Sequence, residues 1–399
     1  MFDTILLEQC SYYSDERVKG SNVLTSEFVS TDSMLPNKRG VINPVTFPNG
    51  NLIYFNVGDI LVGNIRPYLK KIWYSNIKGG CSPDVLVIRA KSNINSKFLY
   101  YTLLRDDFFN HMMNGAKGTK MPRGDKKQVM RFKIPHFDLT NQLKISSVLS
   151  TIDSKIEINN RINTELEAMS KIIFDYWFVQ FDFPDKNGKP YKSSGGKMVW
   201  NEELKIEIPE GWESGSLLQI AQYENGLPCQ KFSPNGNDVL RVIKIREMNE
   251  GFSANTEFVR SDIPKKAIIE SGDVLFSWSA SIDVKLWSGG IGALNQHIFK
   301  VTSVNYPKSF YYHQLINYLQ HFKMMAENRK TTMGHITLEH LRQSRIIIPP
   351  QKLTLKLEAI IGSILSQKVG LEVENHKLIE IRDWLLPMLM NGQLKIYHD

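Results

Sequence analysis

A chain of 399 residues is too long for one ordinary hydrophobic core and suits two to four domains. Its 42% hydrophobic and 23% charged residues are typical of globular proteins, and no apolar run is long enough to predict a membrane span. The net charge of +8 favours a polyanionic partner. Cys10, Cys81 and Cys229 are far apart and form no CxxC pair, which disfavours a disulfide framework or a metal site and predicts a cytoplasmic location.

The first half of the chain recurs in the second half at a fixed offset. Gly58-Asp59-Ile60-Leu61 returns as Gly272-Asp273-Val274-Leu275, so position 58 corresponds to position 272. The same offset aligns three further pairs: Lys71 with Lys285, Trp73 with Trp287, and Ile134-Pro135 with Ile348-Pro349. This many matches in one register indicate two copies of one unit. Each copy begins with short runs rich in Val, Ile and Tyr between Gly, Asn and Pro, which predicts strands and turns.

The first copy, residues 1–138, contains two groups of candidate DNA contacts. Asn64 and Arg66 follow a predicted strand and carry the side chains suited to adenine and guanine edges, although a strand-end arginine is as often a structural ion-pair partner. Residues 115–133 contain seven basic residues and one Asp, and glycines interrupt this predicted loop. Lys and Arg side chains, together with backbone amides freed by glycine, are suited to bind phosphate oxygens. A solvated surface loop is the alternative. The candidates in this loop are Lys117, Lys120, Arg123, Lys126 and Lys127.

The second copy, residues 208–350, follows an exposed linker predicted over residues 183–207 from its Gly, Ser and Lys content. Its candidate DNA contacts lie in segments that correspond to those of the first copy. They are Ser277, Ser279, Arg329, Lys330, Thr331, Thr332 and His335. Because the framework is repeated but these residues differ, the two copies are predicted to read different DNA sequences.

Each copy ends in a long predicted helix, residues 139–182 and 351–394. A strict 4-3 spacing selects eleven positions in each helix, of which eight and nine are apolar, and this is typical of a coiled-coil seam. Both seams turn polar near the middle, at Lys155 and Gln367. The seam residues predicted to pack between the helices are Ile145, Val148, Ile152, Ile162, Leu166, Met169, Ile173, Leu357, Ile360, Ile364, Leu371, Leu378 and Leu385.

The predicted fold class is α+β. Two heads of mixed strands and helices are joined by two long helices that form an antiparallel coiled coil, with a pseudo-two-fold internal repeat. Such a helix pair would hold the heads a fixed distance apart. No catalytic or metal-binding motif is present: the sequence has no Walker A, GxGxxG, HExxH or GxSxG pattern. Pro184-Asp185 with Glu203-Leu-Lys205 imitates a nuclease pattern, but it lies in the predicted linker.

These features together resemble the specificity subunit of Type I restriction-modification systems, over about residues 3–394. The resemblance rests on the repeat and on four motifs: Val29-Ser-Thr-Asp-Ser-Met-Leu-Pro-Asn37, Gly-Asp-Ile-Leu-Val-Gly-Asn-Ile-Arg-Pro-Tyr at 58–68, Gly118-Thr-Lys-Met-Pro-Arg-Gly-Asp125, and Phe174-Asp-Tyr-Trp-Phe-Val-Gln-Phe-Asp182. One departure is that the second copy has a Pro-x-x-Trp opening, Pro209 to Trp212, whereas the first copy begins almost at Met1. The first head is therefore expected to lack an N-terminal arm.

The resemblance implies a non-catalytic subunit in which each head reads half of a bipartite site in double-stranded DNA. It implies docking of two methylation subunits, which recruit restriction (motor-nuclease) subunits. No cofactor is expected on this chain, whereas S-adenosylmethionine, ATP and Mg are expected on those partners. Two rival interpretations remain open: a diverged nuclease or methyltransferase acting alone, and a coiled-coil adaptor without DNA affinity.

Overall fold

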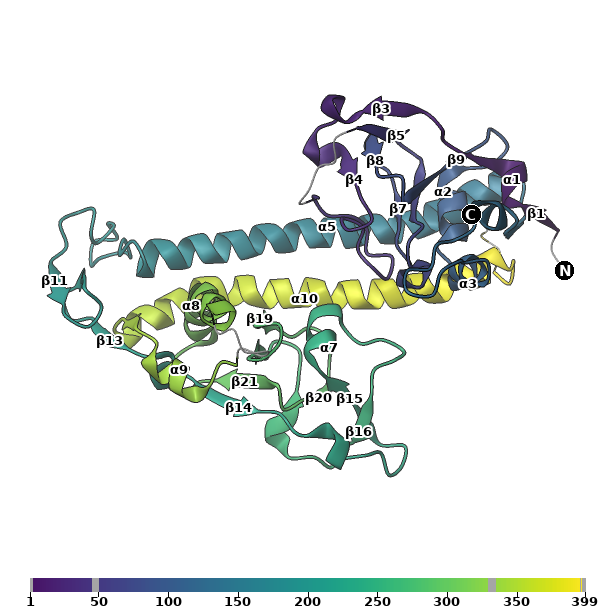
Figure 1. The fold of residues 1–399 in the computed structure, drawn as a ribbon. Coiled ribbons are helices and arrows are strands. Elements are labelled where there is room, and N and C mark those ends of the chain that lie inside the picture. The colour runs from purple at the N-terminus through teal and green to yellow at the C-terminus, as the bar shows by residue number, and fades with distance from the viewer. Residues whose placement is uncertain (1–2, 45–49, 329–334, 395, 397–399) are drawn as a thin grey trace. The chain divides into compact units, whose positions relative to one another are not determined.

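The computed structural model describes residues 3–44, 50–328, 335–394 and 396. It forms two compact units, one of Met1–Lys155 with Leu378–Asp399 and the other of Ile156–Lys377. Each unit contains one head and a segment of each of two 40-residue helices, α5 (Leu139–Phe178) and α10 (Gln351–Met390). These helices are blue-green and yellow in Figure 1. Both helices are thus shared between the units, so the compact units do not coincide with the domains predicted from sequence.

Head 1, the part of the first unit before α5, is built on two four-stranded sheets. The first sheet has the order β2 (Ser11–Tyr13), β9 (Val85–Ala90), β6 (Ile60–Gly63), β7 (Ile72–Tyr74). The second has the order β3 (Arg17–Lys19), β5 (Asn51–Phe55), β8 (Gly79–Cys81), β4 (Phe28–Val29). β1 (Thr4–Leu6) pairs with β10 (Lys133–Pro135), and the helices are α1 (Leu7–Cys10), α2 (Ser96–Leu103), α3 (Asp106–Asn114) and α4 (Lys126–Met130).

Head 2, residues 208–350 of the second unit, repeats this plan. Its first sheet has the order β14 (Gln222–Asn225), β21 (Ile298–Thr302), β18 (Val274–Ser277), β19 (Asp283–Leu286), with every neighbouring pair antiparallel as in head 1. The second has the order β16 (Phe258–Arg260), β15 (Val239–Ile243), β20 (Gly292–Leu294), β17 (Ile268–Ile269). β13 (Glu213–Gly215) pairs with β22 (Ile346–Ile348), and the helices are α6 (Leu217–Ile220), α7 (Ile245–Glu250), α8 (Lys308–Asn328) and α9 (Leu338–Gln343).

The second sheets share three strands and differ in the fourth. β4 lies parallel to β8 in head 1 as β15 lies parallel to β20 in head 2, and β5 and β17 take the antiparallel place beside β8 and β20. The fourth strand is added at opposite edges, since β3 pairs with β5 whereas β16 pairs with β15. The duplicated sequence therefore keeps a common framework while the edges diverge. Residues 183–207, predicted as a linker, contain β11 (Met198–Asn201), which pairs with β12 (Ile206–Pro209).

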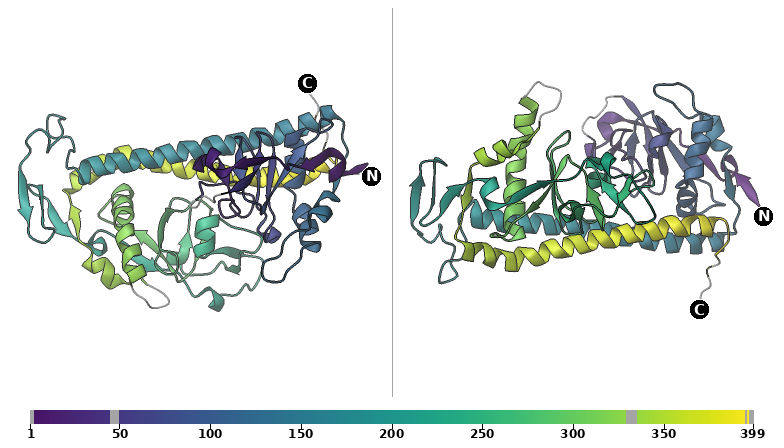
Figure 2. Two further views of the ribbon diagram at one scale, coloured as in Figure 1. Left: turned by 45° about the horizontal axis from the view of Figure 1, so that its top comes forward. Right: turned by 90° about the horizontal axis from the view of Figure 1, so that it is seen from below.

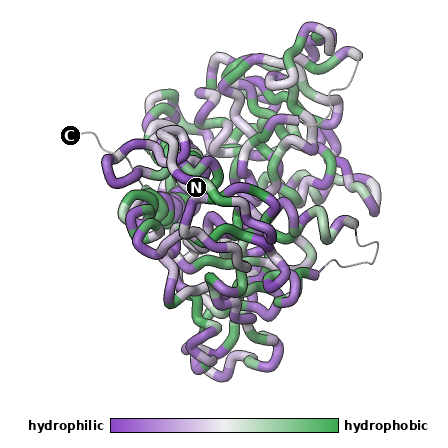
Figure 3. The backbone as a smooth tube through the Cα atoms, turned by 90° about the vertical axis from the view of Figure 1, so that its left-hand side faces the viewer, coloured by the Kyte–Doolittle hydropathy of each residue, from purple (hydrophilic) through white to green (hydrophobic). Residues whose placement is uncertain are grey.

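The core of each unit includes both long helices. In the first unit, Phe98 and Phe108 of the head cluster with Leu149 of α5 and Leu386 of α10, all essentially buried. In the second unit, Phe310 clusters with Phe174 of α5 and with Leu357 and Ile361 of α10. Hydrophobic (green) and hydrophilic (purple) segments alternate along the backbone tube in Figure 3. None of the helices within the described residues is long and apolar enough to cross a membrane.

Within each unit the α5 and α10 segments lie side by side and run in opposite directions, as both views in Figure 2 show. Three polar pairs set their alignment: Arg382 Nη1 lies 3.0 Å from Asp153 Oδ1, Asn375 Nδ2 donates to Asn160 Oδ1 at 2.9 Å, and Lys368 Nζ lies 2.9 Å from Glu167 Oε1. The paired residue numbers add to 535 each time, so the helices are antiparallel and the pairs recur every seven residues. The coiled coil predicted from the sequence is confirmed.

The line of contact lies about one residue away from the predicted seam. Of the predicted seam residues, Ile145 and Leu357 are buried, whereas Ile162, Met169 and Ile360 are exposed by 37%, 52% and 42%. Partly buried are Val148, Ile152, Leu166, Ile173, Ile364, Leu371, Leu378 and Leu385. The residue that follows is buried at eight of the thirteen predicted positions: Ser146, Leu149, Asn163, Ser170, Phe174, Ile361, Leu365 and Leu386. The seam prediction is wrong at Ile162, Met169 and Ile360, because it rested on the spacing of apolar residues whereas the contact line includes polar ones.

The contact line can be tested with two leucines in the first turns of α10. Leu357 is fully buried, whereas Leu355 is 56% exposed. We expect Leu357→Ala to lower the free energy of unfolding by about 2–5 kcal/mol, because it leaves a cavity in the core. Leu355→Ala is expected to change it by less than about 0.5 kcal/mol. Chemical denaturation of both variants measures the difference, and equal effects would show that the buried side of α10 has been assigned wrongly.

A buried histidine joins α8 to α5 in the second unit. His313 is 2% exposed, its ring stacks on Phe174 at 5.1 Å, its Nδ1 donates to the Ser309 carbonyl at 2.8 Å, and its Nε2 lies 3.1 Å from Ser170 Oγ. Desolvation lowers the pKa of His313 to about 4. When α2 and α8 are aligned from their first residues, Tyr101 takes the place of His313, and it donates to Asp153 at 2.7 Å. The joint is thus neutral in one unit and charged in the other.

The His313 joint predicts a loss of stability in acid. The folded pKa lies below the ordinary value near 6.5, so the stabilisation is present above pH 6.5 and is lost as the pH falls toward 4. Between pH 7.5 and 5 this loss is on the order of 2 kcal/mol. His313→Phe keeps a ring against Phe174 but cannot titrate, so its melting temperature is expected to fall less over this interval than that of the unmodified chain. If the melting temperatures of the variant and the unmodified chain fell by the same amount, His313 would not be the group that causes the loss of stability.

Candidate nucleic-acid interface

In head 1 the backbone joins the basic loop to the end of β6, which the sequence did not predict. Ile65 forms a β-bridge with Arg123, the Arg66 N–H donates to the Pro122 carbonyl at 2.8 Å, and the Gly124 N–H donates to the Asn64 carbonyl at 3.2 Å. These contacts bring together two segments that are distant in the sequence. Both groups of candidate DNA contacts in head 1 therefore lie on one surface.

The basic loop is held at its base while its cationic ends extend into solvent. Lys117 and Arg123 exchange two backbone hydrogen bonds of 3.0 and 2.9 Å, yet their side chains are 85% and 58% exposed. Lys120, Lys126 and Lys127 are also exposed. Asp125 begins α4 by accepting the Gln128 and Lys127 N–H groups, and the bond from Gln128 is the main cause that lowers its pKa. Lys117 Nζ lies 3.6 Å from Asp125 Oδ2, and Arg123 Nη2 lies 3.1 Å from Asp84 Oδ1. A loop fixed at its base with exposed cations suits the phosphates of nucleic acid.

Arg66 has a left-handed backbone, with φ +52° and ψ +64°. Its counterpart in the repeat, Ala280, has φ +56°. Side chains other than glycine seldom adopt this conformation, and such residues cluster at functional sites. Both residues are exposed, so the repeat preserves an unusual turn while exchanging a guanidinium for a methyl group.

Asn64 lies below this surface. It is 8% exposed, and its Oδ1 is buried without a hydrogen-bond partner among the described residues. A Cβ at position 124 would lie 2.8 Å from that oxygen, so Gly124 is needed for the loop to approach. The side chain of Asn64, a predicted base contact, is therefore covered in this structure. Tyr68, two residues after Arg66 in the chain, is 51% exposed.

In head 2 the structure corrects two predicted contacts. Ser277 and Ser279 are 0% and 4% exposed, and Ser277 Oγ donates to the Ser281 carbonyl and accepts the Asp283 N–H at 3.0 Å. The hydroxyl of Ser277 therefore holds the β18–β19 turn rather than facing a ligand. His335 is exposed, and its ring lies 5.5 Å from that of Trp278. Outside the described residues lie Arg329, Lys330, Thr331 and Thr332.

Trp278 and His297 also belong to this surface, and neither was predicted from the sequence as a DNA contact. Trp278 occupies the position of Asn64 in the repeat, and His297 lies 5.5 Å from its ring. The exchange of Asn for Trp at an aligned position was the available signal. His297, between β20 and β21, could not be connected with it before the strand order was known.

Within the described ranges no three His, Cys, Asp or Glu side chains are arranged to hold a metal ion. The three cysteines are buried and unpaired, and burial raises the pKa of Cys10 to about 11 and of Cys81 to about 12. Asp185, part of the nuclease-like pattern, accepts the Asn187 and Lys189 N–H groups of a turn.

Comparison with known proteins identifies the family. The model of the Type I restriction modification DNA specificity domain matches twice, at residues 14–168 and 209–383, which together span most of the chain. The chain belongs to this family. The two matches correspond to the two copies of the repeat, and each match includes most of the long helix that ends its copy.

Similar specificity subunits cover most of the chain. The HindI specificity subunit of Haemophilus influenzae is 24% identical over 92% of this chain and 94% of its own length. The MjaIX specificity subunit of Methanocaldococcus jannaschii is also 24% identical, over 77% of this chain and 71% of its own length. The crystal structure of the S subunit from M. genitalium covers 100% of this chain and 97% of its own, with a TM-score of 0.55 at 14% identity, and so shares the fold.

Removing charge from the basic loop tests whether it contacts phosphates. We expect Lys117→Ala with Lys120→Ala to weaken binding to every DNA duplex and to reduce the slope of log affinity against log salt by roughly 2, since each phosphate contact contributes about 0.9. Lys186→Ala with Lys189→Ala removes the same charge from an exposed turn after α5 and is the control. Fluorescence anisotropy across a salt series measures both pairs. Identical salt slopes for the two pairs would exclude the loop as a phosphate contact.

Proposed function

We propose that this specificity subunit reads a bipartite site in double-stranded DNA, with one half-site for each head. The observation that supports this most is the repeated framework with divergent exposed residues. Both heads place a left-handed residue after the equivalent strand, at Arg66 and Ala280, but surround it with different side chains. Among the described residues at this surface, head 1 offers cations, and head 2 offers Trp278 and histidines. A shared scaffold with different reading groups suits two different half-sites.

The antiparallel helix pair would set the distance between the half-sites. Extending both helices equally should therefore lengthen the spacer. The pairing of residues whose numbers add to 535 requires the two insertions to lie opposite each other, between Thr164 and Glu165 in α5 and between Gly370 and Leu371 in α10. Insertions at Lys155 and Gln367 would instead displace the polar pairs between them.

One heptad in each helix adds about 10.5 Å at 1.5 Å per residue, close to three base pairs. We expect methylation mapping to return the same half-sites with a spacer about three pairs longer, or no site if the added third of a DNA turn prevents both heads from binding. If the extended variant bound a duplex with the original spacer at full strength, the helix pair would not set the distance between the half-sites. A heptad in α5 alone is the control, since it breaks the pairing and should destabilise the fold.

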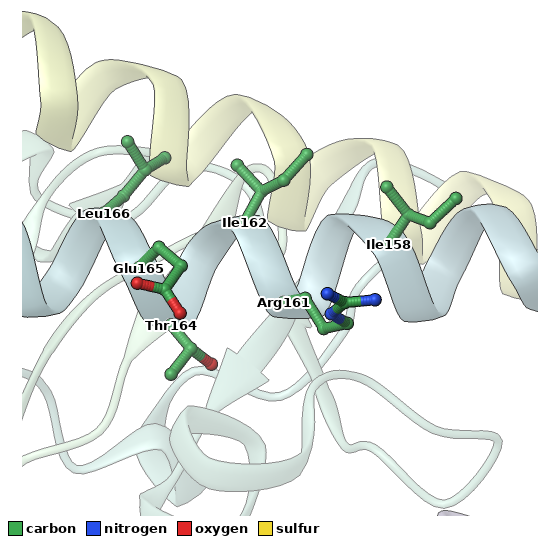
Figure 4. A pocket seen from close by; sticks show the side chains of 6 residues that line it. All are labelled: Ile158, Arg161, Ile162, Thr164, Glu165 and Leu166. Atoms are coloured by element: carbon green, nitrogen blue, oxygen red, sulfur yellow. The ribbon is translucent and has the colours of Figure 1, made fainter.

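Two equivalent apolar patches support docking of two methylation subunits. On α5, Met169 and Ile172 are 52% and 66% exposed, and at the equivalent positions of α10, counted from the first residue of each helix, Ile381 and Trp384 are 47% and 57% exposed. Each compact unit carries one of these patches. Adjacent to the α5 patch is an open hollow of about 450 Å³ lined by Ile158, Arg161, Ile162, Thr164, Glu165 and Leu166, whose side chains Figure 4 shows along α5. Duplicated exposed apolar surface suits two copies of one partner.

Single charges in these patches test the docking. We expect Ile172→Asp or Trp384→Asp each to leave the melting temperature unchanged, because both side chains are exposed, but to reduce the partner from two copies to one. The double variant should retain none. Leu355→Asp, equally exposed on α10 but outside the patches, is the control. Native mass spectrometry of the co-purified complex counts the partners, and two partners on the double variant would disprove this docking surface.

In this proposal the chain has no catalytic site, and the restriction subunits join through the methylation subunits. S-adenosylmethionine, ATP and Mg would be bound by those partners. A metal-dependent nicking assay on the isolated chain separates this function from a nuclease acting alone, since no cleavage is expected. Loss of DNA affinity at every salt concentration would instead favour a coiled-coil adaptor.

A further inference from the structure

The end of β18 in head 2 carries a cluster of four side chains, Trp278, Asn225, His297 and His335, here called the Trp278 cluster. The Trp278 ring lies 5.5 Å from each imidazole, tilted at 49° to His297 and at 68° to His335. The backbone holds the same segments together, because the Ile336 N–H donates to the Trp278 carbonyl at 2.9 Å and the Trp278 N–H to the His297 carbonyl at 3.4 Å. Three segments distant in the sequence thus meet at one indole ring.

A hydrogen bond from the Trp278 indole fixes the orientation of Asn225 in this cluster. The indole N–H of Trp278 can only donate, and it donates to Asn225 Oδ1 at 3.0 Å. The Asn225 side-chain N–H₂ is therefore directed away from the indole. Asn225, His297 and His335 are exposed, and neither imidazole makes a hydrogen bond to another described residue. Asn225, His297 and His335 thus contact the half-buried Trp278 ring and keep donors or acceptors free for a ligand.

We propose that the Trp278 cluster is the base-reading surface of head 2, and this rests on the proposed function of that head. Trp278 is a positioning residue, whereas Asn225, His297 and His335 supply donors and acceptors to base edges. The cluster contains no lysine or arginine, so it cannot draw affinity from phosphate charge as the loop of head 1 can. Its contribution is therefore to selectivity among base pairs rather than to general affinity.

The position of the cluster in the repeat supports this role independently. Trp278 aligns with Asn64 and precedes Ala280, the counterpart of Arg66, by two residues. In head 1 the same place is where the basic loop joins the end of β6. Head 2 therefore presents hydrogen-bonding groups where head 1 presents a guanidinium, and the two heads use different chemistry at one location of a common fold.

Binding of the full chain to a duplex panel tests the proposal. The panel contains the site found by methylation mapping and every single base-pair change in both half-sites. We expect His297→Ala and His335→Ala to reduce discrimination roughly ten- to hundred-fold at one to three pairs of one half-site. The other half-site and the salt slope should stay unchanged. His321→Ala, an exposed histidine of α8 in the same head, is the matched control.

Asn225→Asp is the second variant, since its carboxylate still accepts the Trp278 N–H but can no longer donate to a base. We expect it to change the preference at one pair of the same half-site while the melting temperature is retained. Equal weakening on all duplexes, or unchanged discrimination in all three variants, would overturn the assignment. A wild-type chain that prefers no sequence at all would instead refute the proposed function itself.

Discussion

Three polar pairs spaced seven residues apart fix how α5 lies against α10: Asp153 with Arg382, Asn160 with Asn375, and Glu167 with Lys368. Sliding one helix by a heptad would place Lys368 opposite Asn160 and Asn375 opposite Asp153, and would leave Arg382 and Glu167 without their partners. Lys368 is only 6% exposed; burial alone would lower its pKa, but Glu372 and Glu167 raise it above the ordinary value. After such a shift Lys368 would keep Glu372 of its own helix but lose Glu167, and Arg382 would lose Asp153, so the observed alignment is preferred.

The cores of both units depend on this alignment. Leu149 and Leu386 belong to the core of the first unit, and Phe174 and Leu357 to that of the second. Each helix therefore contributes to both cores, and a shift of one helix would disturb both heads at once. Apolar residues such as Ile172 and Trp384 are exposed, whereas Lys368 and Asn375, which pair with α5, are buried. The helix pair thus combines an inner contact that includes polar pairs with exposed apolar residues on its outer surface.

The duplication, the two long helices and their antiparallel arrangement could be predicted from the sequence, because a repeat and a helical periodicity can both be read directly from the order of residues. The sequence was not sufficient for the contact line, where Asn163 and Ser170 are buried beside the exposed Ile162 and Met169. Ser277 was misassigned because a strand-end hydroxyl looks the same in sequence whether it holds a turn or faces solvent. The contact between Ile65 and Arg123 depends on strand order, which local pattern does not encode.

The left-handed turn shared by Arg66 and Ala280 has a consequence for how such proteins change over evolution. The turn forms with a long cation in one copy and with a methyl group in the other, so its geometry is set by the surrounding backbone and not by its own side chain. We therefore expect a change of side chain at this position to alter the chemistry exposed at the surface while the turn is retained. If this surface contacts DNA, a lineage carrying this scaffold could change its recognition through single codon changes while each intermediate stays folded.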